Sequence, residues 1–95
     1  MIVADVSVVP IGEGTSVSRF VKKAVKALDG SGLKVQHGPM STSLEAVSLD
    51  ELFSAVRKAH DAVLAAGAKR VVTTIKIDDR RDKDHTMASK LRAIE

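Results

Sequence analysis

Hydroxyl and carboxylate side chains alternate with other residues along three β-branched or apolar stretches of the chain. Asp5 and Ser7 occupy alternate positions in one stretch, Ser43 and Glu45 do so in a second, and Thr74 lies in a third. Alternate residues of a β-strand point to the same face of a sheet, so we expect these polar groups to share one face. Such groups can donate and accept hydrogen bonds with a polar ligand. A solvated sheet face and a binding site closed over by a second subunit are both compatible with this pattern.

Other patterns lack the partners that their chemistry needs. Gly12-Glu13-Gly14 is followed neither by a third glycine nor by Gly-Lys-Ser/Thr, so we expect a flexible connection and not a phosphate loop. The stretch from Asp78 to Asp84 lacks the glycine and terminal glutamate of a calcium loop and interleaves basic residues with aspartates, which favours a salt-bridged or intersubunit turn. His37, His60 and His85 have no metal-ligand spacing, and a packed or interface histidine is the expected role.

Catalysis has no positive support in the sequence. No serine has the Gly-x-Ser-x-Gly setting of a nucleophile elbow, no nucleophile is paired with a recognisable base, and there is no cysteine. We therefore predict a protein that is not an enzyme, with no catalytic residues, no metal ligands and no cofactor.

The elements that must position the polar side chains are four strands and three helices. Pro10 ends the first strand, and a Gly38-Pro39 turn joins the second to the third. The predicted strands are Ile2–Val9, Leu33–His37, Met40–Val47 and Arg70–Ile77.

Helical spacing of apolar residues predicts the helices. The first is capped by Thr15 or Ser16 and ends at Gly30. The second starts at a Ser48/Glu51 capping box and ends at Gly67, and a short tail helix follows. The expected apolar faces carry Val17, Phe20, Val21, Ala24 and Leu28, then Leu49, Leu52, Phe53, Val56, Val63 and Leu64, then Met87, Leu91 and Ile94.

The order β-α-β-β-α-β plus a tail helix predicts a ferredoxin-like α+β fold, with a four-stranded antiparallel sheet and two helices on one face, as a single domain over residues 1–95. The other sheet face is expected to be uncovered. The residues expected to face the helices are Ile2, Ala4, Val6, Val8, Met40, Thr42, Leu44, Ala46, Val71, Thr73, Ile75 and Ile77. The residues expected on the open face are Val3, Asp5, Ser7, Val9, Ser41, Ser43, Glu45, Val72, Thr74, Lys76 and Asp78.

Composition excludes several partners. The 15 Lys and Arg residues against 12 Asp and Glu leave a net charge of only +3, and the open sheet face has none of the aromatic rings on which RNA-recognition modules stack bases, so nucleic acid is not expected. Neither a long apolar run nor a basic leader followed by one is present, so we expect no membrane span, no signal peptide and a cytoplasmic location. A chain of 95 residues with valines on its open face favours a homodimer or homotetramer.

Four segments in fixed order, Val9–Gly12, Met40–Glu45, Gly67–Val71 and Lys76–Arg80, carry a family resemblance. The chain resembles the small thiamine-binding family of archaeal and bacterial proteins, which is related to the YkoF thiamine-binding protein. The resemblance implies a ferredoxin-like subunit, dimers that pack sheet against sheet and commonly form tetramers, and a pocket at the sheet surface for thiamine or its hydroxymethylpyrimidine part. Family members are not known as enzymes.

The same resemblance implies a set of ligand-binding residues. An aminopyrimidine has an amine donor and ring-nitrogen acceptors, and a thiazolium cation favours nearby carboxylate. The chain departs from the family's usual Met-Gly-Thr and Glu-Gly at Ser41 and Ala46, and Lys76 is expected to pair with a carboxylate of Asp5, Asp78 or a partner subunit. An oligomeric regulatory or interaction module that binds another small ligand, such as an amino acid, is the alternative function. The expected ligand-binding residues are Asp5, Ser7, Val9, Met40, Thr42, Ser43, Glu45, Thr74 and Asp78, with Val72 as a further apolar wall.

Overall fold

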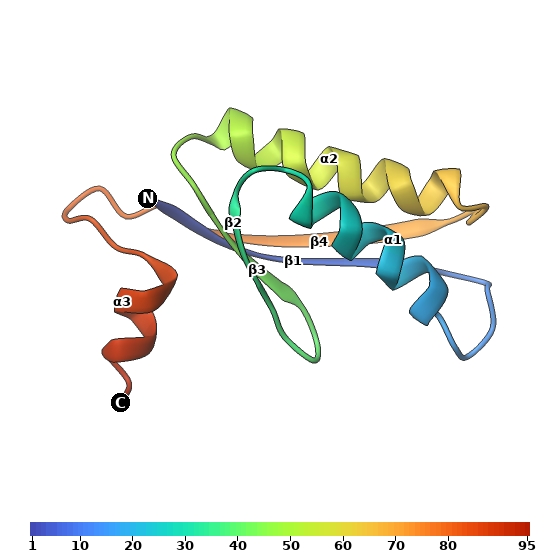
Figure 1. Cartoon of the computed structure of the whole chain (residues 1–95), viewed down its shortest axis with the longest axis horizontal. Coiled ribbons are helices and arrows are strands. Elements are labelled where there is room, and N and C mark those ends of the chain that lie inside the picture. The colour runs from blue at the N-terminus through green and yellow to red at the C-terminus, as the bar shows by residue number, and fades with distance from the viewer.

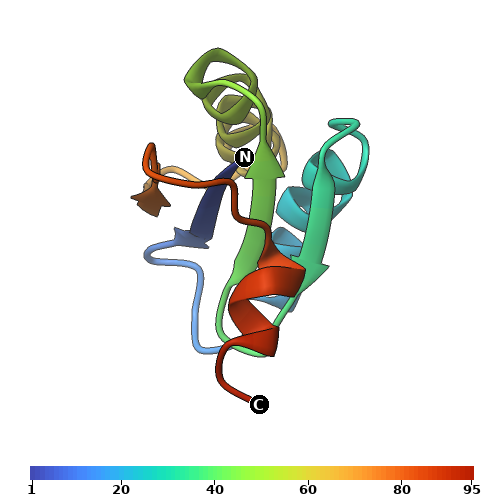
Figure 2. The same ribbon diagram turned by 90° about the vertical axis from the view of Figure 1, so that its left-hand side faces the viewer.

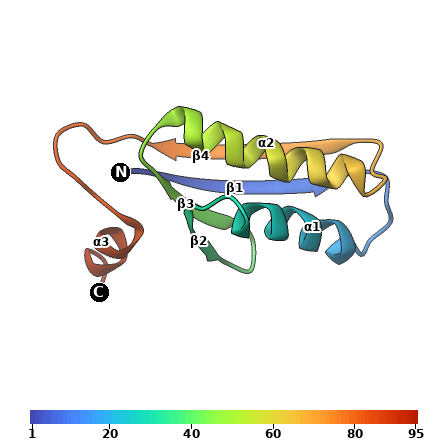
Figure 3. The same ribbon diagram turned by 45° about the horizontal axis from the view of Figure 1, so that its top comes forward.

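A computed structural model of the chain describes residues 1–95 and confirms the predicted order of elements (Figure 1). The four strands form one antiparallel sheet in the order β2-β3-β1-β4, and α1 and α2 lie together on one of its faces (Figure 3). This is the ferredoxin-like α+β fold. The elements are β1 (Ile2–Pro10), α1 (Ser18–Asp29), β2 (Lys34–His37), β3 (Thr42–Ala46), α2 (Leu49–Ala65), β4 (Val71–Asp78) and α3 (Met87–Arg92).

Along β1, the core between the sheet and the two long helices follows the predicted alternation, whereas Val21 of α1 and Ile77 of β4, which were also expected to face inward, are exposed. Ile2, Ala4, Val6 and Val8 of β1 are all buried, while Leu44 is completely buried on β3. They pack with the apolar stripes of α1 and α2 in one cluster of 15 buried residues. Because β1 lies between β3 and β4, its inward residues contact both helices, and this strand determines which side chains face the helices.

The start of α2 is as predicted, whereas the start of α1 is not. The Glu51 N–H donates to the Ser48 side chain over 3.2 Å, and the Glu51 carboxylate accepts from the Val47 N–H. The N-cap of α1 is Val17, which has no capping side chain, so the predicted cap at Thr15 or Ser16 is wrong. A side chain caps a helix only from the residue directly before its first turn, and those two hydroxyls come too early in the chain.

The β2–β3 hairpin has a longer turn than predicted. Four residues, Gly38 to Ser41, connect the strands, the Gly38 N–H donates to the Ser41 carbonyl over 2.8 Å, and the register pairs His37 with Thr42. Proline holds its φ near −65° and restricts the residue before it, so Gly38-Pro39 cannot form the two-residue turn with positive φ at both positions. Met40 therefore lies in the turn, 87% exposed, and the prediction that it faces the helices is wrong.

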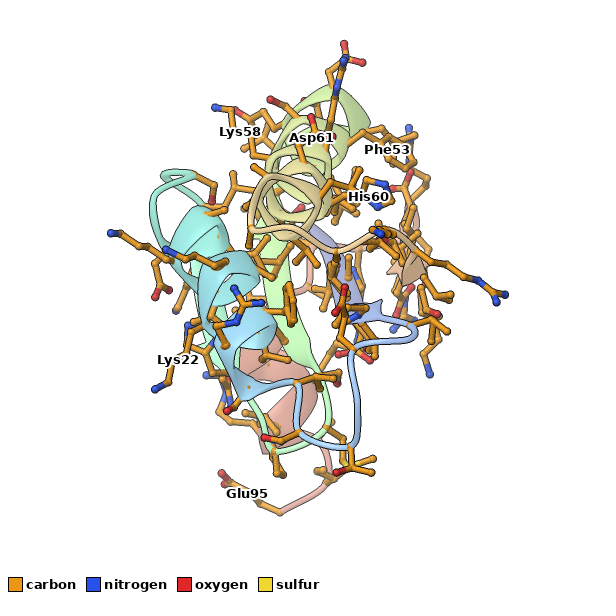
Figure 4. The ribbon with its side chains drawn as sticks, turned by 90° about the vertical axis from the view of Figure 1, so that its right-hand side faces the viewer. Lys22, Phe53, Lys58, His60, Asp61 and Glu95 are labelled. Carbon is orange, nitrogen blue, oxygen red and sulfur yellow. The ribbon has the colours of Figure 1, made fainter.

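Three apolar positions of α2, one aromatic and two aliphatic, also differ from the prediction. Phe53 lies on the same flank of α2 as His60, and its side chain is half exposed and not inward (Figure 4). Leu49 and Leu64 are exposed at the two ends of the helix. The apolar stripe of α2 is wider than the surface that the sheet offers, because the fully buried Leu52 and Val63 already fill the contact.

The sheet face opposite the long helices is partly covered by α3, although it was expected to be bare. Figure 2 shows α3 in front of β3 and β2, and the Met87 N–H at its start donates to the Glu45 carboxylate over 2.6 Å. Met87 and Val3 are buried where α3 meets the sheet. Leu91 and Ile94 of the predicted apolar side remain exposed, and Ile94 lies beyond the end of α3. No helix is long and apolar enough to cross a membrane.

Candidate functional site

Strand register gathers charged groups from β1, β3 and β4 on the face that α3 partly covers. Asp5 lies opposite Lys76 on one side and Ser43 on the other, while Val3 lies opposite both Asp78 and Glu45. A hollow of about 290 Å³ is present here, which we call the open-face hollow. Its lining residues are Val3, Ala4, Asp5, Ser43, Lys76, Asp78 and Lys90.

The carboxylates of the open-face hollow already have partners. Lys90 on α3 donates to Asp78 over 2.6 Å, and this hydrogen bond holds the pKa of Asp78 below its ordinary value of 3.8. Asp5 accepts a hydrogen bond from the Ser41 hydroxyl over 2.7 Å. Lys76 forms no ion pair within 4.0 Å, so its expected pairing with Asp5 or Asp78 within the subunit is wrong. Its ammonium group is available to a ligand or a partner.

Glu45 occupies a different setting from the other predicted acids. Its side chain is only 5% exposed, and one carboxylate oxygen accepts the Met87 N–H. An ionised carboxylate can only accept hydrogen bonds, and the first amides of a helix have no partner inside the helix. Glu45 therefore anchors the start of α3 on the sheet.

A second hollow lies along the edge of β1, beyond the point where its pairing with β3 stops. β3 pairs with β1 only from Ile2 to Val6, whereas β1 continues to Pro10, so the last residues of β1 border a hollow of about 170 Å³. We call this the hairpin groove. Its lining residues are Val6, Ser7, Val8, Val9, Val21, Ala24, Val25, Leu28, His37, Gly38, Pro39, Met40, Ser41 and Thr42.

A chain of hydrogen bonds across three elements reaches the hairpin groove. The Asp29 carboxylate at the end of α1 lies 2.8 Å from His37 Nε2, and His37 Nδ1 lies 3.3 Å from the Thr42 hydroxyl. The sequence patterns did not predict this arrangement. A four-residue turn would have placed His37 opposite Thr42, and that register was the available signal.

The predicted ligand-binding residues divide between the two hollows. Ser7, Val9, Met40 and Thr42 line the hairpin groove, whereas Asp5, Ser43 and Asp78 line the open-face hollow. Two of the nine predicted residues line neither hollow: Thr74, which pairs with Ser7 on the exposed face of β4, and Glu45, which anchors α3. The Ser41 hydroxyl, which donates to Asp5, joins the two hollows, because Ser41 lines the first and Asp5 the second.

The charged turn and His60, which were expected from the sequence to be structural, both form contacts within the subunit. The turn after β4 is salt-bridged, with Arg80 on Asp82 and Arg81 on Asp79, and these hydrogen bonds lower the pKa of both aspartates. His60 packs as expected, with Nδ1 2.6 Å from the Thr73 hydroxyl.

Two further features near the charged turn contain none of the predicted site residues. A wide hollow of about 670 Å³ lies between the turn and the start of α2, with lining side chains of both charges. His85 is buried before α3, and its Nε2 has no hydrogen-bond partner. No group of three or more His, Asp or Glu side chains is arranged to hold a metal ion.

Comparison with known proteins identifies a family whose members resemble this chain over nearly its whole length. Residues 4–95 match the family described as thiamine-binding protein. A UPF0045 protein of Methanothermobacter thermautotrophicus is 47% identical over 95 residues, which cover 99% of this chain and 96% of that protein. A UPF0045 protein of Bacillus subtilis is 41% identical over 99% of this chain and 94% of its own length.

Solved structures agree with the fold. The crystal structure of a hypothetical protein of Methanocaldococcus jannaschii has a TM-score of 0.90 and 46% identity, and covers 98% of this chain and 94% of that one. A Thermotoga maritima protein, named for thiamine biosynthesis or salvage, has a TM-score of 0.83 at 22% identity, with 99% and 98% of the two chains covered. At that identity, the second likeness concerns the fold.

Proposed function

The chain belongs to the thiamine-binding protein family, and from that premise we propose that it binds thiamine or its hydroxymethylpyrimidine part without catalysing a reaction. The observation that carries the proposal is the hairpin groove, which combines apolar walls with a few polar groups. Small-molecule sites have this character, with apolar side chains supplying most of the contact and a few hydrogen bonds fixing orientation.

The pyrimidine ring fits the hairpin groove best. Val9 and Met40 provide apolar walls for a planar ring, while the hydroxyls of Ser7 and Thr42 can pair with its amine and ring nitrogens. These four residues are the part of the sequence-predicted set that lines the hairpin groove. The exposed position of Met40 suits a flexible side chain that closes over a bound ring.

The thiazolium part of thiamine belongs on the open sheet face. Asp5 is the carboxylate of that face that contacts the groove, since it accepts a hydrogen bond from the groove residue Ser41. A cation beside Asp5 gains a favourable charge interaction without displacing the Lys90–Asp78 pair. Ser43, Thr74 and the α3 anchor Glu45 then frame the site and do not touch the pyrimidine.

A second copy of the chain would cover this face in a homodimer or homotetramer. The exposed part of the face carries Val72, which is 44% exposed, and Leu91 from α3. Burial of such side chains drives association, and a covering subunit would exclude water from a bound cation and its carboxylate. The ligand would then lie at the sheet surface between subunits.

An amino acid in the open-face hollow is the alternative function. This hollow brings Lys76, which forms no ion pair, close to Asp5, with Lys90 and Asp78 beside them. Paired charges of both signs suit the carboxylate and ammonium groups of a zwitterion.

Calorimetry with thiamine, hydroxymethylpyrimidine and a panel of amino acids tests the proposal. We expect both pyrimidine compounds to bind, and Thr42→Val to weaken both by about 5- to 150-fold, because it leaves a ligand donor or acceptor unpaired. Thr73→Val is the matched control, since Thr73 bonds His60 and lies outside the groove. Binding of amino acids without binding of either pyrimidine would support the alternative and contradict the proposal.

A further inference from the structure

The hydrogen-bond chain behind Thr42 determines which way its hydroxyl points. An ionised carboxylate only accepts hydrogen bonds, so Asp29 takes the hydrogen on His37 Nε2. In the neutral imidazole, Nδ1 is then an acceptor, and the partner that it faces is the Thr42 hydroxyl. Thr42 therefore donates its hydrogen to His37, and its oxygen lone pairs remain for the groove.

The setting of Asp29 supports a directing role. Asp29 is the last residue of α1, where the helix dipole disfavours a negative charge. Next to it, Gly30 caps the helix and Gly32, at φ +82°, turns the chain back towards β2. This short return places the carboxylate beside the His37 ring, and the interaction with His37 offsets the unfavourable helix position.

No other ionisable side chain competes for the groove. His37 is the only titratable residue in its lining, the turn from Gly38 to Ser41 contributes none, and Asp29 is the only carboxylate within 4.0 Å of the ring. The other histidine–threonine pair, His60 with Thr73, has no carboxylate within that distance. Of the two histidine–threonine pairs, one thus has a carboxylate on the second ring nitrogen of its histidine and the other does not.

We propose that Asp29 and His37 are positioning residues that hold Thr42 as a hydrogen-bond acceptor, so that the hairpin groove selects an amine donor on the ligand's ring. This inference rests on the proposed function and specifies how the pyrimidine is recognised. The 4-amino group of thiamine supplies such a donor. Oxythiamine, in which an oxo group replaces that amine, presents an acceptor to the acceptor Thr42 and leaves both unpaired.

The test measures the affinity ratio of thiamine to oxythiamine by calorimetry. In the unaltered protein we expect a preference for thiamine of about tenfold or more. Asp29→Asn should lower that ratio by about five- to tenfold, because the amide can donate to Nε2, which lets Nδ1 carry the hydrogen and turns the Thr42 hydrogen towards the groove. Asp61→Asn, which removes a similarly exposed carboxylate on α2, should leave the ratio unchanged.

A second measurement follows the tautomer directly. Imidazole ¹⁵N spectra of the free protein should show His37 protonated at Nε2, with His60 as the internal reference, and Asp29→Asn should alter only the His37 signals. Asp29→Glu should restore both the tautomer and the preference.

The two proposals fail in distinguishable ways. If the unaltered protein binds neither compound, the proposed function and the inference that rests on it are both wrong. If it binds thiamine but Asp29→Asn preserves the preference, or if His37 is protonated at Nδ1, only the inference is overturned.

Discussion

Replacing Glu45 by alanine should release α3 from the sheet while the rest of the subunit stays folded. The substitution removes the acceptor of the Met87 N–H, which is buried with its residue. An unpaired buried amide costs about 1 to 3 kcal/mol, which corresponds to about a 5- to 150-fold shift in the docking equilibrium of α3. The cluster of 15 buried core residues contains no residue of α3, so the penalty should remain local.

Amide hydrogen exchange measured by NMR distinguishes the release of α3 from unfolding of the whole subunit. In Glu45→Ala, the amides of Lys90 in α3 and of its C-cap Ala93 should exchange about 5- to 150-fold faster, whereas the amides of α2 should keep their protection. Glu51→Ala is the matched control, because its carboxylate also accepts a backbone N–H, that of Val47 over 3.1 Å, but at an exposed site. Equal acceleration throughout α2 and α3 would refute the reasoning, and so would unchanged exchange in α3.

Three further predictions concern the open face. Because the pKa of Asp78 is lowered, its pair with Lys90 contributes fully to α3 docking above pH 3.8, and this contribution should disappear as the pH falls below that value. Amide hydrogen exchange of α3, followed through an acid titration, measures this loss. Ser41→Gly frees the Asp5 carboxylate and should strengthen binding of cationic thiamine more than of neutral hydroxymethylpyrimidine, which calorimetry compares; equal effects would contradict a thiazolium beside Asp5. Val72→Asp should shift sedimentation equilibrium towards monomer without loss of helical circular dichroism, and an unchanged mass would show that no subunit covers this face.

Strand faces and the second helix were predictable because they depend on local rules. Alternation along β1 decides which side chains meet the helices, and the Ser48 cap with acidic residues behind it marks the start of α2. The open-face positions of Asp5 and Ser43 follow from the same alternation.

The division of the site into two hollows was not predictable, because it depends on how far the hairpin reaches along β1. The Gly38-Pro39 dipeptide suggested a tight turn, and the actual four-residue turn shifts the register and leaves Met40 exposed. The Asp29–His37–Thr42 chain depends on that register and on the angle at which α1 ends. Cover of the open face by α3 depends on a buried contact between Glu45 and a residue 42 positions later in the chain, which no local pattern indicates.

An NMR titration of ¹⁵N-labelled protein with hydroxymethylpyrimidine tests the central claim most directly, because it reports binding and its location together. We predict that the largest amide shifts occur at Ser7, Val9, Met40 and Thr42, which line the hairpin groove. Shifts confined to Lys76 and Asp78 of the open-face hollow, or no shifts at saturating ligand, would contradict the account.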